Sequence, residues 1–308
     1  MSATLSAATP APARRRATGA RNGSRWSNAL FIVPFLVVYL LLLVLPLLKG
    51  IYMSLQDVDM LSQTADFVGF KNYSDLWHDD IFRGAVRNTF AFVAMSTPVF
   101  VALGLGLALA LNRPGRTAAA LRAIFFGSSV LSVTIVTLVW KLVLMPHQGL
   151  LANLTHATGL PDLSPLTSEA WALPTVAAVT VWWIIGLPMM LFLAALQQVP
   201  GEVYEAAALD NASRWRTLWH ITLPAIRRTV ALVAVIEVIL QFQLFGQAQL
   251  LTQGGPNNSS RPIVQFIYEA GFQHWTLGAA AAASQVLFGI MLIAMAVQVY
   301  ISSRKESY

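Results

Sequence analysis

The segment that decides the fold is polar and lies between two long apolar segments: residues 199–224 read VPGEVYEAAALDNASRWRTLWHITLP. Pro200 suits the first position of a helix, where its missing N–H leaves no hydrogen bond unmade. Glu202 and Glu205 fall in the first turns that follow, where carboxylates suit the positive end of a helix. The segment is therefore predicted to begin as a helix.

The second half of the segment predicts a turn and another helix. Asp210-Asn211 should end the first helix, because Asn tolerates a positive φ better than most residues. Ser213 can cap a second short helix, and Pro224 should stop it. A helix, a tight turn and a helix, held at a membrane surface between two spans, have a form suited to docking into another protein.

The same segment resembles a known motif. Glu205-Ala206-Ala207, Asp210, Ala212 and Ile221-x-Leu223-Pro224 resemble the "EAA" coupling loop of ABC importer permeases. That family has Gly where this chain has Asn211, the next-best residue for a left-handed turn. Arg228 stands where the family often has a Pro, so only the position at which the loop ends is left open. The loop is taken to run over residues 199–228.

The resemblance implies that this loop is a coupling helix that sits in a cleft of a cytoplasmic ATPase. The positions that it assigns to the contact are Glu205, Ala206, Ala207, Leu209, Asp210, Asn211, Ala212 and Ser213. The alternative is a solvated amphipathic hairpin that only connects two membrane helices.

Composition indicates a membrane protein. The chain has 308 residues, of which 56% are hydrophobic and 11% charged, and its mean hydropathy is +0.61. Soluble domains carry roughly 25% charged residues. The formal charge of +6 can suggest nucleic acid, but the placement of the basic residues fits membrane topology better, so no nucleic-acid partner is expected. The absence of cysteine excludes disulfides and thiolate metal sites.

Six segments are long and apolar enough to cross a bilayer, since a spanning helix needs about 20 mostly apolar residues. They are residues 30–48, 86–111, 121–145, 171–196, 230–251 and 277–302. Pro34 and Pro46 should break the first segment, and Pro98 and Pro188 predict kinks in the second and fourth. The predicted fold class is an all-α integral membrane protein with six transmembrane helices, and the resemblance implies the type I ABC importer permease fold.

The domain organisation and the orientation follow from composition and charge. Residues 1–27 lack acids and an apolar core, so they are no secretory signal and are predicted to be a disordered cytoplasmic tail. Residues 28–308 form the predicted transmembrane permease domain. Most of the 20 Lys and Arg fall before the first span, after the second, fourth and sixth, whereas six Asp crowd the first outer loop. Positive charge favours the cytoplasmic side, so a multi-pass protein of the bacterial inner membrane with both termini in the cytoplasm is expected.

No phosphate-binding loop of the form G-x-x-x-x-G-K-[ST] occurs in the chain. ATP and Mg are therefore expected on partner ATPase subunits, and no cofactor, metal site or catalytic residue is expected in this chain.

Two further motifs sharpen the resemblance. Gly69-Phe70-Lys71-Asn72-Tyr73 with Arg87-Asn88-Thr89 is similar to a segment of carbohydrate-importer permeases, and Leu251-Thr252-Gln253-Gly254-Gly255-Pro256 resembles their Gly-Gly-Pro loop. Alone, the Gly-Gly-Pro loop reads equally as a tight turn that ends a helix. The chain looks like the maltose-permease F half and the glycerol-phosphate-permease A half. This implies a second permease subunit in a heterodimer, two cytoplasmic ATPase subunits, an extracytoplasmic solute-binding protein and a sugar, a di- or oligosaccharide, as substrate.

Candidate substrate contacts begin with Glu237, because an ionisable group inside a span is costly and indicates function. Gln241 is four residues on and shares its helix face, with Leu244 one turn further; Gln243 lies on a neighbouring face. Sugar hydroxyls need donors and acceptors, and an unmatched hydroxyl costs about 1–3 kcal/mol. Hydrogen bonding between helices is the alternative role for these amides.

The resemblance to the maltose-permease F half implies a set of contact positions. They are Glu237, Leu240, Gln241 and Leu244 on the fifth span, Ile185, Gly186 and Met189 on the fourth, and Ser129 and Val133 on the third. Glu237 stands where the maltose case has a small hydroxyl, and Met189 where it has an aromatic. These departures argue against assuming maltose.

An ionised Glu237 in the pathway would repel anions. It favours a neutral oligosaccharide, an amino sugar or a choline-bearing glycerol-phosphate diester. Three rivals remain: an ion-coupled secondary transporter, a membrane enzyme, and an amino-acid or peptide permease. Membrane acids are scarce and all five His fall in loops, which counts against the first rival. No Ser/His/Asp cluster lies within a span, which counts against the second.

Overall fold

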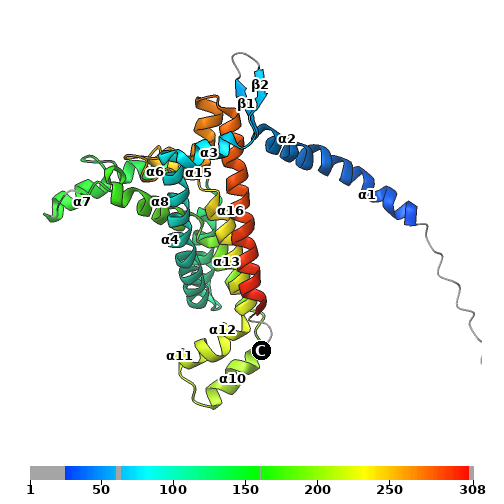
Figure 1. The fold of residues 1–308 in the computed structure, drawn as a ribbon. Helices are drawn as coiled ribbons and strands as arrows, with labels where there is room; N and C mark the ends of the chain where they lie inside the picture. The colour runs from blue at the N-terminus through cyan, green and yellow to red at the C-terminus, as the bar shows by residue number, and fades with distance from the viewer. Residues whose placement is uncertain (1–24, 60–63, 160, 162, 305–308) are drawn as a thin grey trace, which may run out of the picture. The chain divides into compact units, whose positions relative to one another are not determined.

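The computed structural model of the chain describes residues 25–59, 64–159, 161 and 163–304. It divides into two compact units, residues 1–49 and 50–308, which are described separately here (Figure 1). The predicted tail at 1–27 lies outside the described residues except for 25–27, which begin a helix.

The first predicted span is helical throughout. Helix α1 (Arg25–Tyr39), a π turn (Leu40–Val44) and helix α2 (Leu45–Met53) follow one another without interruption. The part long and apolar enough to cross a membrane is Ile32–Met53. The prediction of a span at 30–48 is confirmed, but Pro34 and Pro46 do not break it. Pro34 lies inside α1, and Pro46 lies near the start of α2, directly after the π turn.

The second unit begins with structure that the sequence did not predict. Strand β1 (Gln56–Asp59) pairs antiparallel with β2 (Thr64–Phe67), with Asp57 opposite Asp66. Helix α3 (Lys71–His78) follows.

The second predicted span is confirmed and starts earlier than expected. Helix α4 (Asp80–Leu111) has 32 residues and begins at Asp79, whose carboxylate accepts hydrogen bonds from the backbone N–H of Ile81 and Phe82. Pro98 lies inside α4 and does not end it. Helix α4 packs against α8, α9 and α13, so it is the central helix of the unit.

The third and fourth predicted spans are each a bent pair. Helices α5 (Arg116–Ser128) and α6 (Val133–Val143) meet at 97°, and α8 (Glu169–Ile184) and α9 (Gly186–Leu196) meet at 49°. The segment predicted at 121–145 is therefore a bent pair of helices, and the bend between them was not predicted. The kink predicted at Pro188 is confirmed and lies at Ile185, because proline cannot donate to the carbonyl one turn before it, that of Ile184. Between the pairs lie α7 (Leu150–Thr158) and a 3₁₀ turn (Pro165–Thr167).

The fifth predicted span is interrupted. Helix α13 (Arg227–Phe242) ends before residues 243–245, and α14 (Gly246–Leu251) is short. Helix α15 (Ile263–Tyr268), a π turn (Glu269–Gln273) and α16 (Leu277–Arg304) complete the described chain, and α16 confirms the sixth span. By length and composition, the described residues contain three spanning helices, or five when each bent pair is one span, rather than six.

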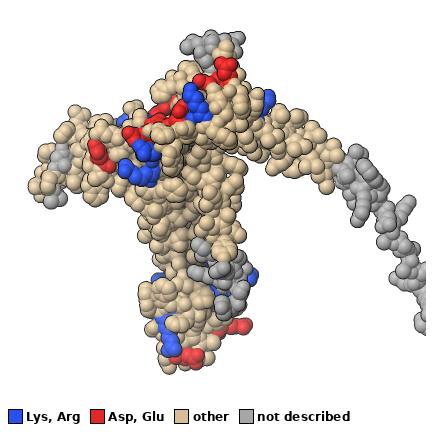
Figure 2. Space-filling view, in the orientation of Figure 1, with Lys and Arg blue, Asp and Glu red and all other residues tan. Residues whose placement is uncertain are grey.

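Four clusters of buried apolar residues hold the described part of the second unit together, and the two largest each include residues of α4. One surrounds Phe92 and Val176 and includes Leu244 of the loop before α14, and the other surrounds Met189, Phe192 and Val233. Within this unit, β1, β2, α3 and α15 lie at one end and the hairpin of α10 to α12 lies at the other (Figure 1). On the face seen in Figure 2, charged side chains gather at these two ends and the surface between them is uncharged, as a bilayer requires.

Candidate functional site

The hairpin at 199–224 has the predicted shape. Helix α10 (Gly201–Leu209) is followed by a turn and α11 (Arg214–Thr217). Pro200 is the residue before the first helical turn rather than inside it, and Glu202 lies in that first turn.

The turn of the hairpin is a Schellman motif. Asn211 has φ 54°, in the left-handed region. The N–H of Ala212 donates to the carbonyl of Ala207 at 2.9 Å, and the N–H of Asn211 donates to that of Ala208 at 3.1 Å. These two bonds satisfy the last carbonyls of α10 and fix the angle at which the chain leaves it. The predicted role of Asn211 is confirmed.

The second arm of the hairpin is longer than predicted. Ser213 caps α11 by accepting the N–H of Arg216 at 3.3 Å. The helix then continues through a π turn (Leu218–Thr222) and α12 (Leu223–Ala225). The prediction that Pro224 stops the helix was wrong, because Pro224 lies inside α12, which ends at Ala225.

The hairpin presents its tip to solvent. Leu209 is 85% exposed and Trp215 is 68% exposed, whereas Ala207 is buried. Of the other predicted coupling residues, Glu205, Ala206, Asp210, Asn211 and Ser213 are exposed and Ala212 is half-buried.

A groove of about 430 Å³ runs between the hairpin and the end of α4. It is lined by Leu109 of α4 and by Tyr204, Ala212 and Thr222 of the hairpin, and Thr222 Oγ1 donates to the Tyr204 hydroxyl at 3.4 Å. The two arms are thus tied to each other and lie next to the central helix. Motion of the hairpin can pass to α4 over a short path.

The predicted polar pair of the fifth span is real and deeply buried. Gln241 Nε2 donates to Glu237 Oε2 at 2.9 Å, and the two residues are 3% and 1% exposed. A buried carboxylate without a partner would be costly, so this bond lets α13 carry Glu237 inside an apolar bundle.

The other predicted substrate contacts divide into buried and open positions. Ile185, Gly186, Met189 and Leu244 are buried within the second unit. Leu240 is 40% exposed and Gln243 is exposed at the end of α13. Ser129 and Val133 are half-buried at the bend between α5 and α6.

The structure brings only some of these positions together. Glu237 contacts Gln241, and Val133 packs on Gly246, where an added Cβ would lie 3.1 Å from it. Gly186 packs instead on the backbone of α5, where an added Cβ would lie 2.3 Å from the Phe125 carbonyl oxygen. Ser129 Oγ donates to the Trp183 carbonyl at 3.4 Å.

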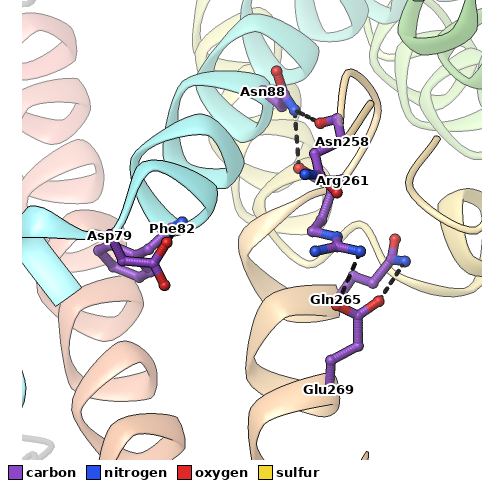
Figure 3. A network of polar contacts seen from close by, with 7 residues as sticks. All are labelled: Asp79, Phe82, Asn88, Asn258, Arg261, Gln265 and Glu269. Carbon is purple, nitrogen blue, oxygen red and sulfur yellow. Dashed lines mark hydrogen bonds and ion pairs between the residues drawn. The ribbon is translucent and has the colours of Figure 1, made fainter. Parts of the chain in front are cut away.

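The two outer sequence motifs meet in space. Asn88 of α4 donates through Nδ2 to the carbonyls of Asn258 at 2.7 Å and Arg261 at 3.1 Å (Figure 3). Thr89 Oγ1 accepts the N–H of Ile263 at 2.9 Å. The Arg-Asn-Thr motif therefore holds the loop that follows Gly-Gly-Pro.

The remaining outer motif anchors the start of the unit. Asn72 Nδ2 donates to the carbonyls of Ser54 and Gln56, each at 2.9 Å, and the Tyr73 hydroxyl shares a 2.7 Å hydrogen bond with the Ser54 hydroxyl. Gly278 of α16 lies against the same place, where an added Cβ would lie 2.1 Å from the Gln56 carbonyl oxygen.

Sequence reasoning missed the ion pair of the outer end. Arg261 Nη2 lies 3.3 Å from Glu269 Oε2, and Gln265 Nε2 donates to Glu269 Oε1 at 3.0 Å (Figure 3). Neither residue was predicted to have a role, because spacing along the chain does not show which side chains of a loop and a helix meet. Among the described residues, no group of three or more His, Cys, Asp or Glu is placed to hold a metal ion.

Comparison with known proteins identifies the family to which this chain is similar. The family model described as "Binding-protein-dependent transport system inner membrane component" matches residues 82–307. The diacetylchitobiose uptake system permease protein NgcF of Streptomyces coelicolor is 33% identical, over 92% of this chain and 85% of its own length. The multiple sugar-binding transport system permease protein MsmF of Streptococcus mutans is 31% identical, over 91% of this chain and 96% of its own length.

Solved structures agree on the fold. A chain of a bacterial alginate ABC transporter, solved in complex with an alginate pentasaccharide-bound periplasmic protein, superposes with a TM-score of 0.80. It is 24% identical, and the match covers 92% of this chain and 96% of that one.

Proposed function

The chain belongs to the family of binding-protein-dependent transport system inner membrane components, and we propose that it is one permease subunit of an ATP-driven sugar importer. As a permease it is a non-catalytic membrane component. Family membership alone does not give the substrate class, the partners or the orientation in the membrane.

The hairpin of α10 to α12 is the observation that supports ATP-driven transport. Its tip is exposed, its turn is fixed by two backbone hydrogen bonds, and its groove adjoins α4. A rigid element that projects from a helical bundle can transmit a push, whereas a flexible loop would absorb it. We therefore assign the contact with the ATPase to Glu205, Leu209, Asp210 and the residues of the turn.

The assembly follows from this contact. Two cytoplasmic ATPase subunits bind ATP and Mg, a second permease subunit completes the pathway, and an extracytoplasmic solute-binding protein delivers substrate. Closure of the ATPases moves the hairpins and shifts the spans between inward-facing and outward-facing states, each favoured by its own contacts. The hairpin end faces the cytoplasm, because Arg214, Arg216, Arg227 and Arg228 lie there.

The proposed substrate is a di- or oligosaccharide. Two relatives that cover most of this chain are named for diacetylchitobiose uptake and for multiple sugar-binding transport. Leu240, on α13, and Gln243, directly after α13, are predicted contacts that stay open in this chain, so they suit an apolar and a polar contact with a sugar ring. A choline diester of glycerol phosphate is the second candidate substrate. The carboxylate of Glu237 favours this cationic group if the carboxylate faces the pathway.

Uptake into proteoliposomes that contain the complete transporter tests the proposal. Uptake of a labelled neutral oligosaccharide should require ATP inside the vesicles and the solute-binding protein outside, and should be indifferent to a proton or sodium ionophore. Uptake abolished by the ionophore and independent of ATP would instead establish an ion-coupled secondary transporter. Transport of glycerophosphocholine in place of every sugar would move the substrate to the second class.

A further inference from the structure

A pocket of about 380 Å³ opens at the outer end of the second unit, the end opposite the hairpin. Residues of α3, α15, the π turn after it and α16 line the pocket. None of the predicted substrate contacts is among them. The pocket is therefore separate from the predicted substrate contacts.

The charges of the pocket are unbalanced. Asp75, Asp79 and Glu269 supply three carboxylates against the guanidinium of Arg261, and His274 is the other titratable residue in the lining. Asp79 is occupied at its α4 cap, where it accepts the N–H of Ile81 at 2.7 Å. Asp75 is exposed at the mouth, and its carboxylate has no hydrogen bond or ion pair within the described part of the chain. The site complements a basic group that enters from outside.

Glu269 forms the inner wall of the pocket and is already shared. It is 8% exposed and holds both Arg261 and Gln265 (Figure 3). A carboxylate has about four lone-pair sites, so a further donor can be accommodated. Such a donor would compete with Arg261, whose Nε is buried without a hydrogen-bond partner in the described structure.

Arg261 connects the pocket to the loop after α14. Its carbonyl accepts the Asn88 amide of α4, and an added Cβ on Gly254 would lie 3.0 Å from the Arg261 Cβ. Arg261 therefore lies where the pocket, the Gly-Gly-Pro loop and Asn88 of the central helix come together.

We propose that this pocket receives a Lys or Arg side chain of the solute-binding protein, and that Arg261 relays its arrival to the Gly-Gly-Pro loop. The inference rests on the proposed function, since it needs a delivery protein. A protein side chain fits better than free substrate, because the pocket lies outside the set of predicted substrate contacts and its mouth faces the solvent at the outer end.

Binding-protein-stimulated ATP hydrolysis by the complete transporter separates the two parts of the proposal. Asp75→Lys should raise the concentration of binding protein for half-maximal stimulation about tenfold, because it places like charges together. Asp75→Asn should raise it about threefold, as expected for loss of one exposed charge pair. Arg261→Gln should lower that concentration, since it removes the guanidinium that competes for Glu269, and should also lower the maximal stimulation, since it removes the relay.

Asp57→Lys is the matched control. Asp57 is an exposed acid of β1 at the same end of the unit, and it does not line the pocket. If Asp57→Lys shifts the half-maximal concentration as much as Asp75→Lys, the binding protein is attracted by the overall negative charge of this end, and the pocket does not receive a basic side chain. If the Asp75 variants lower sugar uptake at unchanged stimulation, the pocket holds a small solute. Absence of any stimulation in the unaltered complex would overturn the proposed function itself.

Discussion

The free energy of unfolding should depend on the hydrogen bond between Glu237 and Gln241, because both side chains are buried. Removal of one partner leaves the other buried without a hydrogen bond, which costs about 1–3 kcal/mol, whereas replacement of both by apolar groups is close to neutral. A comparison of the single and double replacements therefore distinguishes a pair that contacts substrate from a pair that only stabilises the fold.

We expect Glu237→Leu to lower the thermal unfolding temperature of the purified complex, and Glu237→Leu with Gln241→Leu to restore most of it. Because both residues are buried within one chain, the double variant should also keep its sugar selectivity. Gln243→Ala, at an exposed position, should leave unfolding unchanged and weaken uptake. A double variant that is stable and yet transports no sugar would show that Glu237 touches the substrate directly.

Single residues were predictable where one local property decides. Asn211 was assigned to a left-handed turn from its tolerance of positive φ, and Glu237 was placed on one face with Gln241 from their spacing of four. Their surroundings were not predictable, because helical spacing says which residues share a face and not what covers that face. Arg261 and Glu269 were missed for the same reason.

At the scale of elements, the close approach of α9 to α5 depends on Gly186. A Cβ there would lie 2.3 Å from the Phe125 carbonyl oxygen and 2.6 Å from the Phe126 Cα, so the backbone would have to move. In the structure Gly186 lets two helices meet, and its role as a substrate contact stays a prediction.

Gly186→Ala should therefore lower the free energy of unfolding by about 1–3 kcal/mol, as overpacking does. Gly106→Ala is the control, since Gly106 is an exposed helical residue of α4 with nothing within 4 Å of an added Cβ. That control should be neutral or stabilising by about 0.5–1 kcal/mol. Thermal unfolding of the two purified variants in the same detergent measures the difference; equal stability would mean that α5 and α9 do not pack this closely.

Bends within spans were the main failure of sequence reasoning about elements. Hydropathy averages over a window, so it does not register the turn between α5 and α6, where Ser128 Oγ donates to the Trp183 carbonyl at 2.9 Å and Ser132 caps the next helix. The kink before Pro188 was predicted because proline acts on its own backbone. The interruption at 243–245 has no comparable local signal.

At the scale of the whole molecule, the second unit places two working surfaces at opposite ends of a bundle centred on α4. The hairpin lies beside the last turn of α4, at Leu109, and the outer loop is held near its first turns by Asn88. One long helix thus links the surface that we assign to the ATPase with the surface that we assign to the solute-binding protein. The sequence predicted the two ends from charge and motif, but not that α4 contacts both.

The central claim is that the tip of the hairpin faces the cytoplasm and contacts an ATPase. Leu209 is the position of choice, because it is 85% exposed, whereas Ala207 is buried, and the chain has no cysteine of its own. With Leu209→Cys, a membrane-impermeant thiol reagent should label inside-out vesicles and not intact cells, and a short cross-linker should join this residue to the ATPase subunit of the purified complex. Labelling from outside intact cells, with no cross-link to the ATPase, would contradict both the topology and the mechanism.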